Sequence, residues 1–65
     1  MNKHQYRKSI IIGNSVEIVL KKDQGTDKRV TGKVKRILTN ASHHFRGIKV
    51  ELTDGQIGRV QRVLE

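Results

Sequence analysis

The side chains of this sequence that could do chemistry are mostly cationic. Fourteen Lys and Arg residues stand against six Asp and Glu, which gives a formal net charge of +8. This balance favours a polyanionic partner such as RNA or DNA. We select eight cations and one aromatic residue as candidate nucleic-acid-binding residues: Lys21, Lys22, Lys33, Lys35, Arg36, Phe45, Arg46, Lys49 and Arg59.

These cations have a plainer interpretation as well. Lysines on the outer face of a strand are ordinary solvated charge, and they also discourage pairing with other sheet edges. Taken one at a time, each basic residue fits that interpretation better. Taken as a set, they favour a basic stripe that neutralises backbone phosphates and releases counterions.

Reading of base sequence is less favoured, because modules for single-stranded nucleic acid usually interleave several aromatic side chains. Tyr6 and Phe45 are the two aromatic residues of the chain. Phe45 lies in the run His43-His44-Phe45-Arg46, where it could stack on one base or simply cap one end of the fold. We assign no role to Tyr6.

Catalytic and metal-binding patterns are missing from the sequence. There is no Cys, which excludes thiolate zinc sites and thiol catalysis. His43 and His44 are adjacent, so on an extended chain they point to opposite sides. No serine lies in a nucleophile motif and no glycine run matches a phosphate-binding loop. We therefore expect no enzyme, no cofactor, no metal and no small-molecule substrate.

Short β-type segments position the candidate residues. In 15–21, Val16, Ile18 and Leu20 alternate with Glu17 and Val19, which predicts a half-buried strand. The polar segment 22–28 predicts a loop, and 39–46 predicts a second one.

The segment 29–38 predicts a bent second strand. Val30, Gly32 and Val34 share one face, with Lys33 and Lys35 on the other, but Ile37 falls out of phase. A bulge near Lys35-Arg36 would restore the phase, because a bulge sets two residues opposite one.

The segment 47–52 predicts a third strand, with Ile48, Val50 and Leu52 inward and Lys49 and Glu51 outward. If the second and third strands pair with their inward faces matched, Glu51 lies opposite either Lys33 or Lys35. We expect Lys33, Lys35, Lys49 and Arg46 to share one wall.

The dipeptide Asp54-Gly55 predicts a tight hairpin turn of type I′, which needs positive φ at both central residues. A last strand over 57–63 follows, for which we favour Val60 inward. A short turn near the C-terminus is the single helical candidate. Together these elements predict an all-β fold, a small barrel of four to five strands over 10–65 with a flexible basic arm over 1–9.

Four blocks in this order resemble the YwbE family of small uncharacterised bacterial proteins: VEIVLKKDQ at 16–24, ILTN at 37–40, GIKVEL at 47–52 and DGQIGRVQ at 54–61. The resemblance implies an SH3-like barrel, similar to the KOW domains of ribosomal and transcription proteins. It also implies a bacterial cytoplasmic setting, but it implies no biochemical activity.

Two functions remain open. The first is a non-catalytic nucleic-acid-binding module that is RNA-binding or ribosome-associated, with RNA favoured over DNA, and that contacts phosphates through a basic strand face and loop. The second is a protein-interaction adaptor of SH3-like type that binds an acidic partner. We expect no membrane partner, because the chain lacks an amphipathic basic helix and an apolar run long enough to span a bilayer. We also expect a cytoplasmic monomer.

Overall fold

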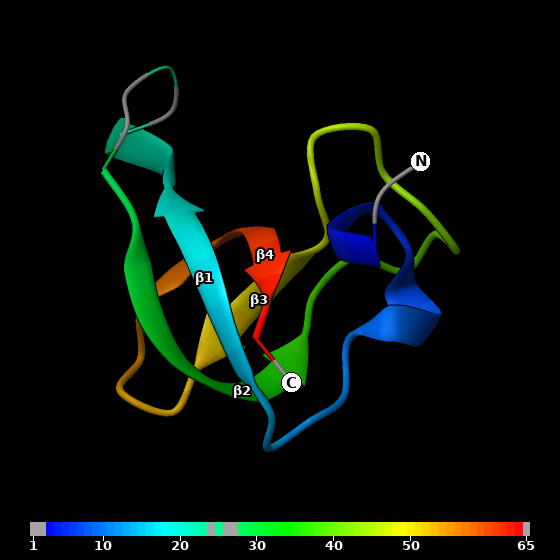
Figure 1. Cartoon of the computed structure of the whole chain (residues 1–65), viewed down its shortest axis with the longest axis horizontal. Helices are drawn as coiled ribbons and strands as arrows, with labels where there is room; N and C mark the ends of the chain where they lie inside the picture. The colour runs from blue at the N-terminus through cyan, green and yellow to red at the C-terminus, as the bar shows by residue number, and fades with distance from the viewer. Residues whose placement is uncertain (1–2, 24, 26–27, 65) are drawn as a thin grey trace.

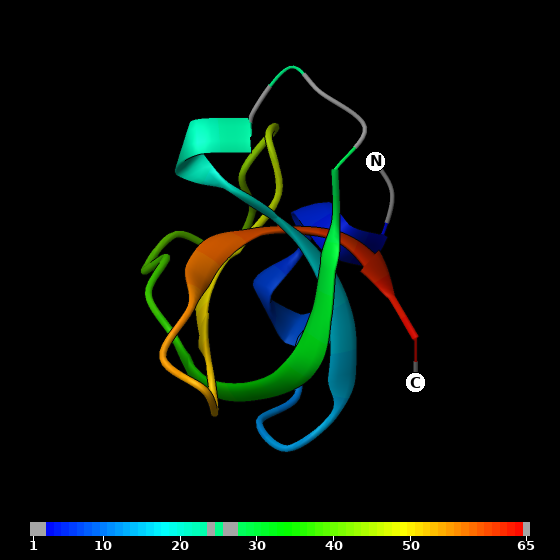
Figure 2. The same ribbon diagram turned by 90° about the vertical axis from the view of Figure 1, so that its left-hand side faces the viewer.

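Four antiparallel strands form a closed barrel in the computed structural model, which describes residues 3–23, 25 and 28–64, without the side chain of Asp23. The strands are β1 (Ser15–Leu20), β2 (Val30–Ile37), β3 (Lys49–Leu52) and β4 (Ile57–Val63). Each pairs with the next, and β4 pairs back to β1 (Figure 1). The ring that they make is visible in Figure 2. The prediction of an all-β fold is confirmed, and the barrel is consistent with an SH3-like architecture.

Alternation of side chains builds the core as the sequence predicted. Seven aliphatic side chains, at most 1% exposed, point inward from the strands and from the residue before β3: Val16, Ile18, Val34, Ile48, Val50, Leu52 and Val60. The preference for Val60 inward is therefore confirmed. Burial of such a side chain contributes roughly 1.5–3 kcal/mol, so this small set supplies most of the hydrophobic stabilisation.

The predicted bulge lies in β2. Val34 pairs with Leu52, but Arg36 pairs with Glu51, so Lys35 is the extra residue on the β2 side. The bulge returns Ile37 to the inner side, where it packs against the core. Its effect on register corrects one expectation: Glu51 lies opposite Arg36, not opposite Lys33 or Lys35. Without the bulge, the pairing of Val34 with Leu52 would have placed Lys35 opposite Glu51.

The hairpin between β3 and β4 is confirmed, but its turn is not of type I′. No residue other than glycine has positive φ among the described residues, so Asp54 lacks the backbone conformation that type I′ requires. Gly55, at φ +92°, donates its N–H to the Leu52 carbonyl at 2.9 Å. The Leu52 N–H donates to the Gln56 carbonyl at 2.8 Å, so the loop between these two residues has three residues with the left-handed glycine last, a common hairpin alternative.

The N-terminal segment, expected to be a flexible basic arm over 1–9, has local structure in its described residues 3–9. Residues 3–9 form two 3₁₀ turns, η1 (Lys3–Gln5) and η2 (Arg7–Ser9), and Tyr6 makes a β-bridge to His43. The Ile10 side chain that follows is 4% exposed in the core. Short turns of this kind carry no hydrophobic period, so periodicity does not reveal them. The flexibility of this segment stays a prediction.

The helical candidate near the C-terminus is wrong, because β4 continues to Val63, where it pairs with Val16. A third 3₁₀ turn, η3 (Lys21–Asp23), follows β1 instead. None of the helical turns in the described part of the chain has the length or the apolar character to cross a membrane.

Candidate nucleic-acid interface

A groove on the outside of the barrel gathers four cationic side chains. Lys21 comes from η3, Arg46 from the loop before β3, Lys49 from β3 and Arg59 from β4. Ile57 and Gly58 complete its described lining. We call these six residues the cationic groove. All four cations were among the residues selected from the sequence, and no carboxylate lies among the six.

Strand register places two of these cations side by side. Lys49 and Arg59 are directly paired residues on β3 and β4. On its other side Lys49 adjoins Thr39, whose Oγ1 accepts the Lys49 backbone N–H at 2.8 Å. Like charges that face each other across strands destabilise a sheet, so the pairing of these two charges does not itself stabilise the barrel.

Arg59 is held in place by the backbone of Gly47. Its Nη1 donates a hydrogen bond to the Gly47 carbonyl at 3.0 Å, and the side chain is half-buried. Gly47 itself is buried at φ +103°, and a Cβ there would collide with the Val60 carbonyl oxygen. Glycine is therefore required at this position for both conformation and space.

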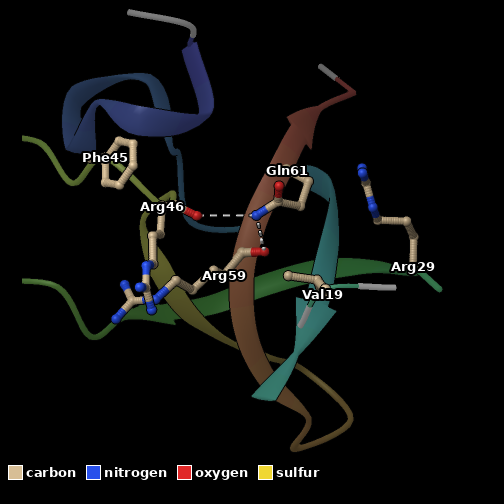
Figure 3. Close-up of a pocket in the computed structure, with 7 residues that line it drawn as sticks. Val19, Arg29, Phe45, Arg46, Arg59 and Gln61 are labelled. Carbon is tan, nitrogen blue, oxygen red and sulfur yellow. Dashed lines mark hydrogen bonds between the residues drawn. The ribbon is translucent and has the colours of Figure 1, made fainter. Parts of the chain in front are cut away.

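A second hollow adjoins the cationic groove and is shown in Figure 3. Arg46 and Arg59 line both hollows, and Val19, Arg29, Phe45 and Gln61 also line the second. We call this second hollow the aromatic hollow. Figure 3 shows Arg46 and Arg59 extending to the same side, whereas Arg29 lies across β1. Phe45 lies at the edge of the aromatic hollow, and its side chain is 73% exposed.

The carboxylates whose side chains are described are occupied elsewhere. Glu17 forms an ion pair with Arg29 at 3.3 Å, and Glu51 forms one with Arg36 at 2.7 Å. Asp54 accepts hydrogen bonds from the backbone and side-chain amides of Gln56. Among the side chains that the structure describes, no carboxylate pairs with a cation of the groove, whereas Arg29 and Arg36 outside it are paired.

The field of these cations reaches His44. Partial burial, together with the charges of Arg59 and Arg46, lowers the pKa of this imidazole below 6.5. Burial and these cations both disfavour the charged form of the imidazole. Within the described chain, no group of three or more His, Asp or Glu residues could hold a metal ion.

The remaining selected residues lie outside the cationic groove. Lys33 is paired with Ser15 on β1, and Lys35 occupies the bulge. The guanidinium of Arg36 is bound to Glu51, and Lys22 is exposed on η3 without lining the groove. The expected wall of Lys33, Lys35, Arg46 and Lys49 is therefore not continuous. The barrel turns β2 away from β4, and the register gives Lys49 the neighbours Thr39 and Arg59.

Two comparisons with known proteins bear on the family. The family described as "Uncharacterized conserved protein (DUF2196)" matches residues 3–63. The chain is 53% identical over 60 residues to "Uncharacterized protein YwbE" of Bacillus subtilis (strain 168), covering 92% of each protein. The chain belongs to the YwbE family. No solved structure matches it.

The YwbE blocks recognised in the sequence coincide with the parts that build the cationic groove. Lys21 lies in the first block, Lys49 in the third and Arg59 in the fourth, while Arg46 directly precedes the third. Three of the four groove cations thus lie within the blocks, and the fourth lies next to one.

Sequence reasoning missed two supporting residues. Gln61 donates its Nε2 amide to the carbonyls of Arg46 (3.1 Å) and Arg59 (3.4 Å), drawn as dashed lines in Figure 3. Gly47 accepts the Arg59 hydrogen bond. Nothing in local pattern identifies such contacts, although a glycine before a strand is a signal of special backbone conformation.

Proposed function

We propose that this protein is a non-catalytic nucleic-acid-binding module that holds backbone phosphates, preferably of RNA, in the cationic groove. The observation that carries the proposal is the convergence of four cations from four segments on one groove without a carboxylate in its described lining. The protein would act in the bacterial cytoplasm, with no catalytic step.

Electrostatics supports the proposal. The paired cations Lys49 and Arg59 repel each other in the free protein, and a phosphate between them would convert that repulsion into attraction. Each phosphate neutralised also releases condensed counterions, which is the main driving force for binding without sequence preference. Guanidinium groups such as those of Arg46 and Arg59 suit phosphate oxygens because they can donate two parallel hydrogen bonds.

The preference for RNA comes from the family resemblance of the sequence, which implies a barrel similar to the KOW domains of ribosomal and transcription proteins. The site favours backbone contact over base-edge readout, since its polar groups are mostly charged donors. We therefore expect weak dependence on base sequence and strong dependence on salt.

A salt titration with matched variants tests the proposal. Labelled RNA is titrated with protein at roughly 50 and 200 mM salt, a range over which phosphate-based binding weakens steeply. The groove variant carries Lys21→Gln, Arg46→Gln and Lys49→Gln, and the control carries Lys22→Gln, Lys33→Gln and Lys35→Gln. Both lose the same charge, so only position differs.

We expect the groove variant to lose tenfold or more in affinity and to bind with a shallower salt slope, by about 0.7 per lost contact to single-stranded RNA. The control should stay close to the natural protein. Equal losses in both variants would show attraction by net charge alone, and undetectable binding of the natural protein at low salt would end the proposal.

One observation favours the second candidate function, a protein-interaction adaptor. Ile11 and Ile12 are 57% and 62% exposed in the turn between η2 and β1, at the opposite end of the barrel from the loop over 39–46 (Figure 1, Figure 2). Adjacent exposed aliphatic side chains are a feature of contact surfaces. If this function holds, a partner captured after nuclease treatment will be lost with Ile11→Ser and Ile12→Ser and kept by the groove variant.

A further inference from the structure

The aromatic hollow beside the cationic groove contains an exposed ring on a fixed backbone. Phe45 is 73% exposed, more than any other large apolar residue described. An exposed ring at the tip of a loose loop would mean little by itself. The contacts around Phe45 show a different situation.

Hydrogen bonds from two other segments hold the backbone on both sides of the ring. The Gln5 side chain donates to the Phe45 carbonyl at 2.7 Å, and the Gln61 side chain donates to the Arg46 carbonyl at 3.1 Å. The His44 N–H donates to the Gln5 carbonyl at 2.8 Å, and the Gly47 N–H donates to the His44 carbonyl at 3.0 Å. The ring therefore projects into solvent from a braced position, which lowers the entropy cost of binding against it.

The surroundings of the ring suit a nucleotide. Arg46 and Arg59 line the same hollow as Phe45, and they also line the cationic groove. A strand whose phosphates lie in the groove would thus bring the next base within the aromatic hollow. Val19, 8% exposed, adds an apolar surface there. Stacking on an aromatic face is open to every base, because each base has a π-face.

We infer that the ligand is single-stranded RNA, with one unpaired base stacked on Phe45 while the neighbouring phosphates lie against Arg46 and Arg59. This inference rests on the proposed function and adds that the bound RNA is single-stranded. In a duplex the bases are already stacked and paired, so the ring would have no free base face to meet.

The experiment compares three probes of about twelve nucleotides, within the range of site sizes for small barrels: single-stranded oligouridylate, a strand of the same length that lacks bases, and an RNA duplex. Phe45→Leu keeps the apolar bulk of the residue and removes the ring. Ile12→Ala is the matched control, because Ile12 is also highly exposed and belongs to the turn between η2 and β1, which lies at the other end of the barrel (Figure 1, Figure 2).

We expect Phe45→Leu to weaken binding of oligouridylate at least about fivefold, the lower end of what one stacked base contributes. Binding of the baseless strand and of the duplex should not change, and Ile12→Ala should change none of the three. Because the chain has no Trp, a Phe45→Trp variant has a single indole, whose fluorescence oligouridylate should quench and the baseless strand should not.

Two results would overturn the inference in distinguishable ways. Equal affinity for the strand with and without bases, with no effect of Phe45→Leu, would refute base stacking and leave phosphate binding intact. Absence of binding to all three probes would refute the proposed function together with the inference.

Discussion

Lys49 and Arg59 face each other across strands β3 and β4, with no carboxylate in the described lining of the groove that they share. Arg59 is further fixed by its hydrogen bond to the Gly47 carbonyl. Like charges on directly paired residues of neighbouring strands cost a sheet roughly 0.2–1 kcal/mol. Replacing Lys49 would relieve this repulsion, whereas replacing Arg59 would also remove its hydrogen bond to the Gly47 carbonyl.

Replacement of Lys49 should therefore separate stability from binding. We expect Lys49→Gln to leave the free energy of unfolding unchanged or to raise it by up to about 1 kcal/mol, because the repulsion with Arg59 is relieved. RNA affinity should fall, and the salt slope should shrink by one contact. Urea unfolding and a salt titration of the same sample measure both effects. The Lys33→Gln control should change neither, and a Lys49→Gln variant that unfolds more easily would contradict the argument.

Gly47 should be the least replaceable of the glycines with positive φ. We expect Gly47→Ala to cost about 3 kcal/mol or more, because strain at positive φ adds to a collision with the Val60 carbonyl. Gly55→Ala is the matched control, since φ is +92° there and a Cβ would meet nothing within 4 Å. It should cost about 1–2 kcal/mol, the left-handed penalty alone. Equal losses in chemical denaturation would show that the collision is relieved by a backbone shift.

Stability should fall as the pH drops below neutrality. Burial and then the charge of Arg29 lower the pKa of His4, and burial followed by Arg59 and Arg46 lowers the pKa of His44. Below about pH 6.5 the unfolded imidazoles take up protons that the folded ones resist, so the unfolded state gains. The stabilisation present above that pH is lost as the pH falls toward the folded-state pKa values.

Urea midpoints at about pH 7.5 and about pH 5, which bracket the ordinary histidine pKa, measure this dependence. The double variant His4→Gln and His44→Gln should show a flatter dependence than the natural protein. A natural protein that is equally stable at both values would contradict the lowered pKa of both histidines.

The N-terminal turns should protect specific amides from hydrogen exchange. The Arg7 N–H donates to the Ser42 carbonyl at 2.9 Å, and the His44 N–H donates to the Gln5 carbonyl at 2.8 Å. Both amides should exchange more slowly than unbonded amides of the same sequence context. If they exchange freely while the Val34 and Val60 amides stay protected, the segment is the flexible arm that the sequence predicts.

Much of the barrel could be predicted because its elements are specified locally. Alternation in β1 and β3 indicates which side chains enter the core, and the phase break before Ile37 reveals the bulge. The Asp54-Gly55 dipeptide locates the hairpin, although a glycine-last loop replaces the expected type I′ turn. These features depend on residues close together in the chain.

The candidate site could be predicted only in part, because it depends on register and on distant contacts. The sequence identified Lys21, Arg46, Lys49 and Arg59 as candidates but grouped Lys49 with Lys33 and Lys35. A one-residue bulge changes every cross-strand partner beyond it, so Glu51 meets Arg36 instead. Gln5 and Gln61 donate hydrogen bonds to backbone carbonyls of the loop over 39–46. These contacts join residues far apart in sequence, so no local pattern specifies them.

The most direct test of the cationic groove is a backbone-amide chemical-shift map during addition of single-stranded RNA. We predict that the largest shifts fall on Lys21, Arg46, Lys49, Gly58 and Arg59, and that they shrink as salt is raised. Shifts centred on the outer face of β2, at Lys33 and Lys35, or shifts absent throughout the chain at low salt, would contradict the account.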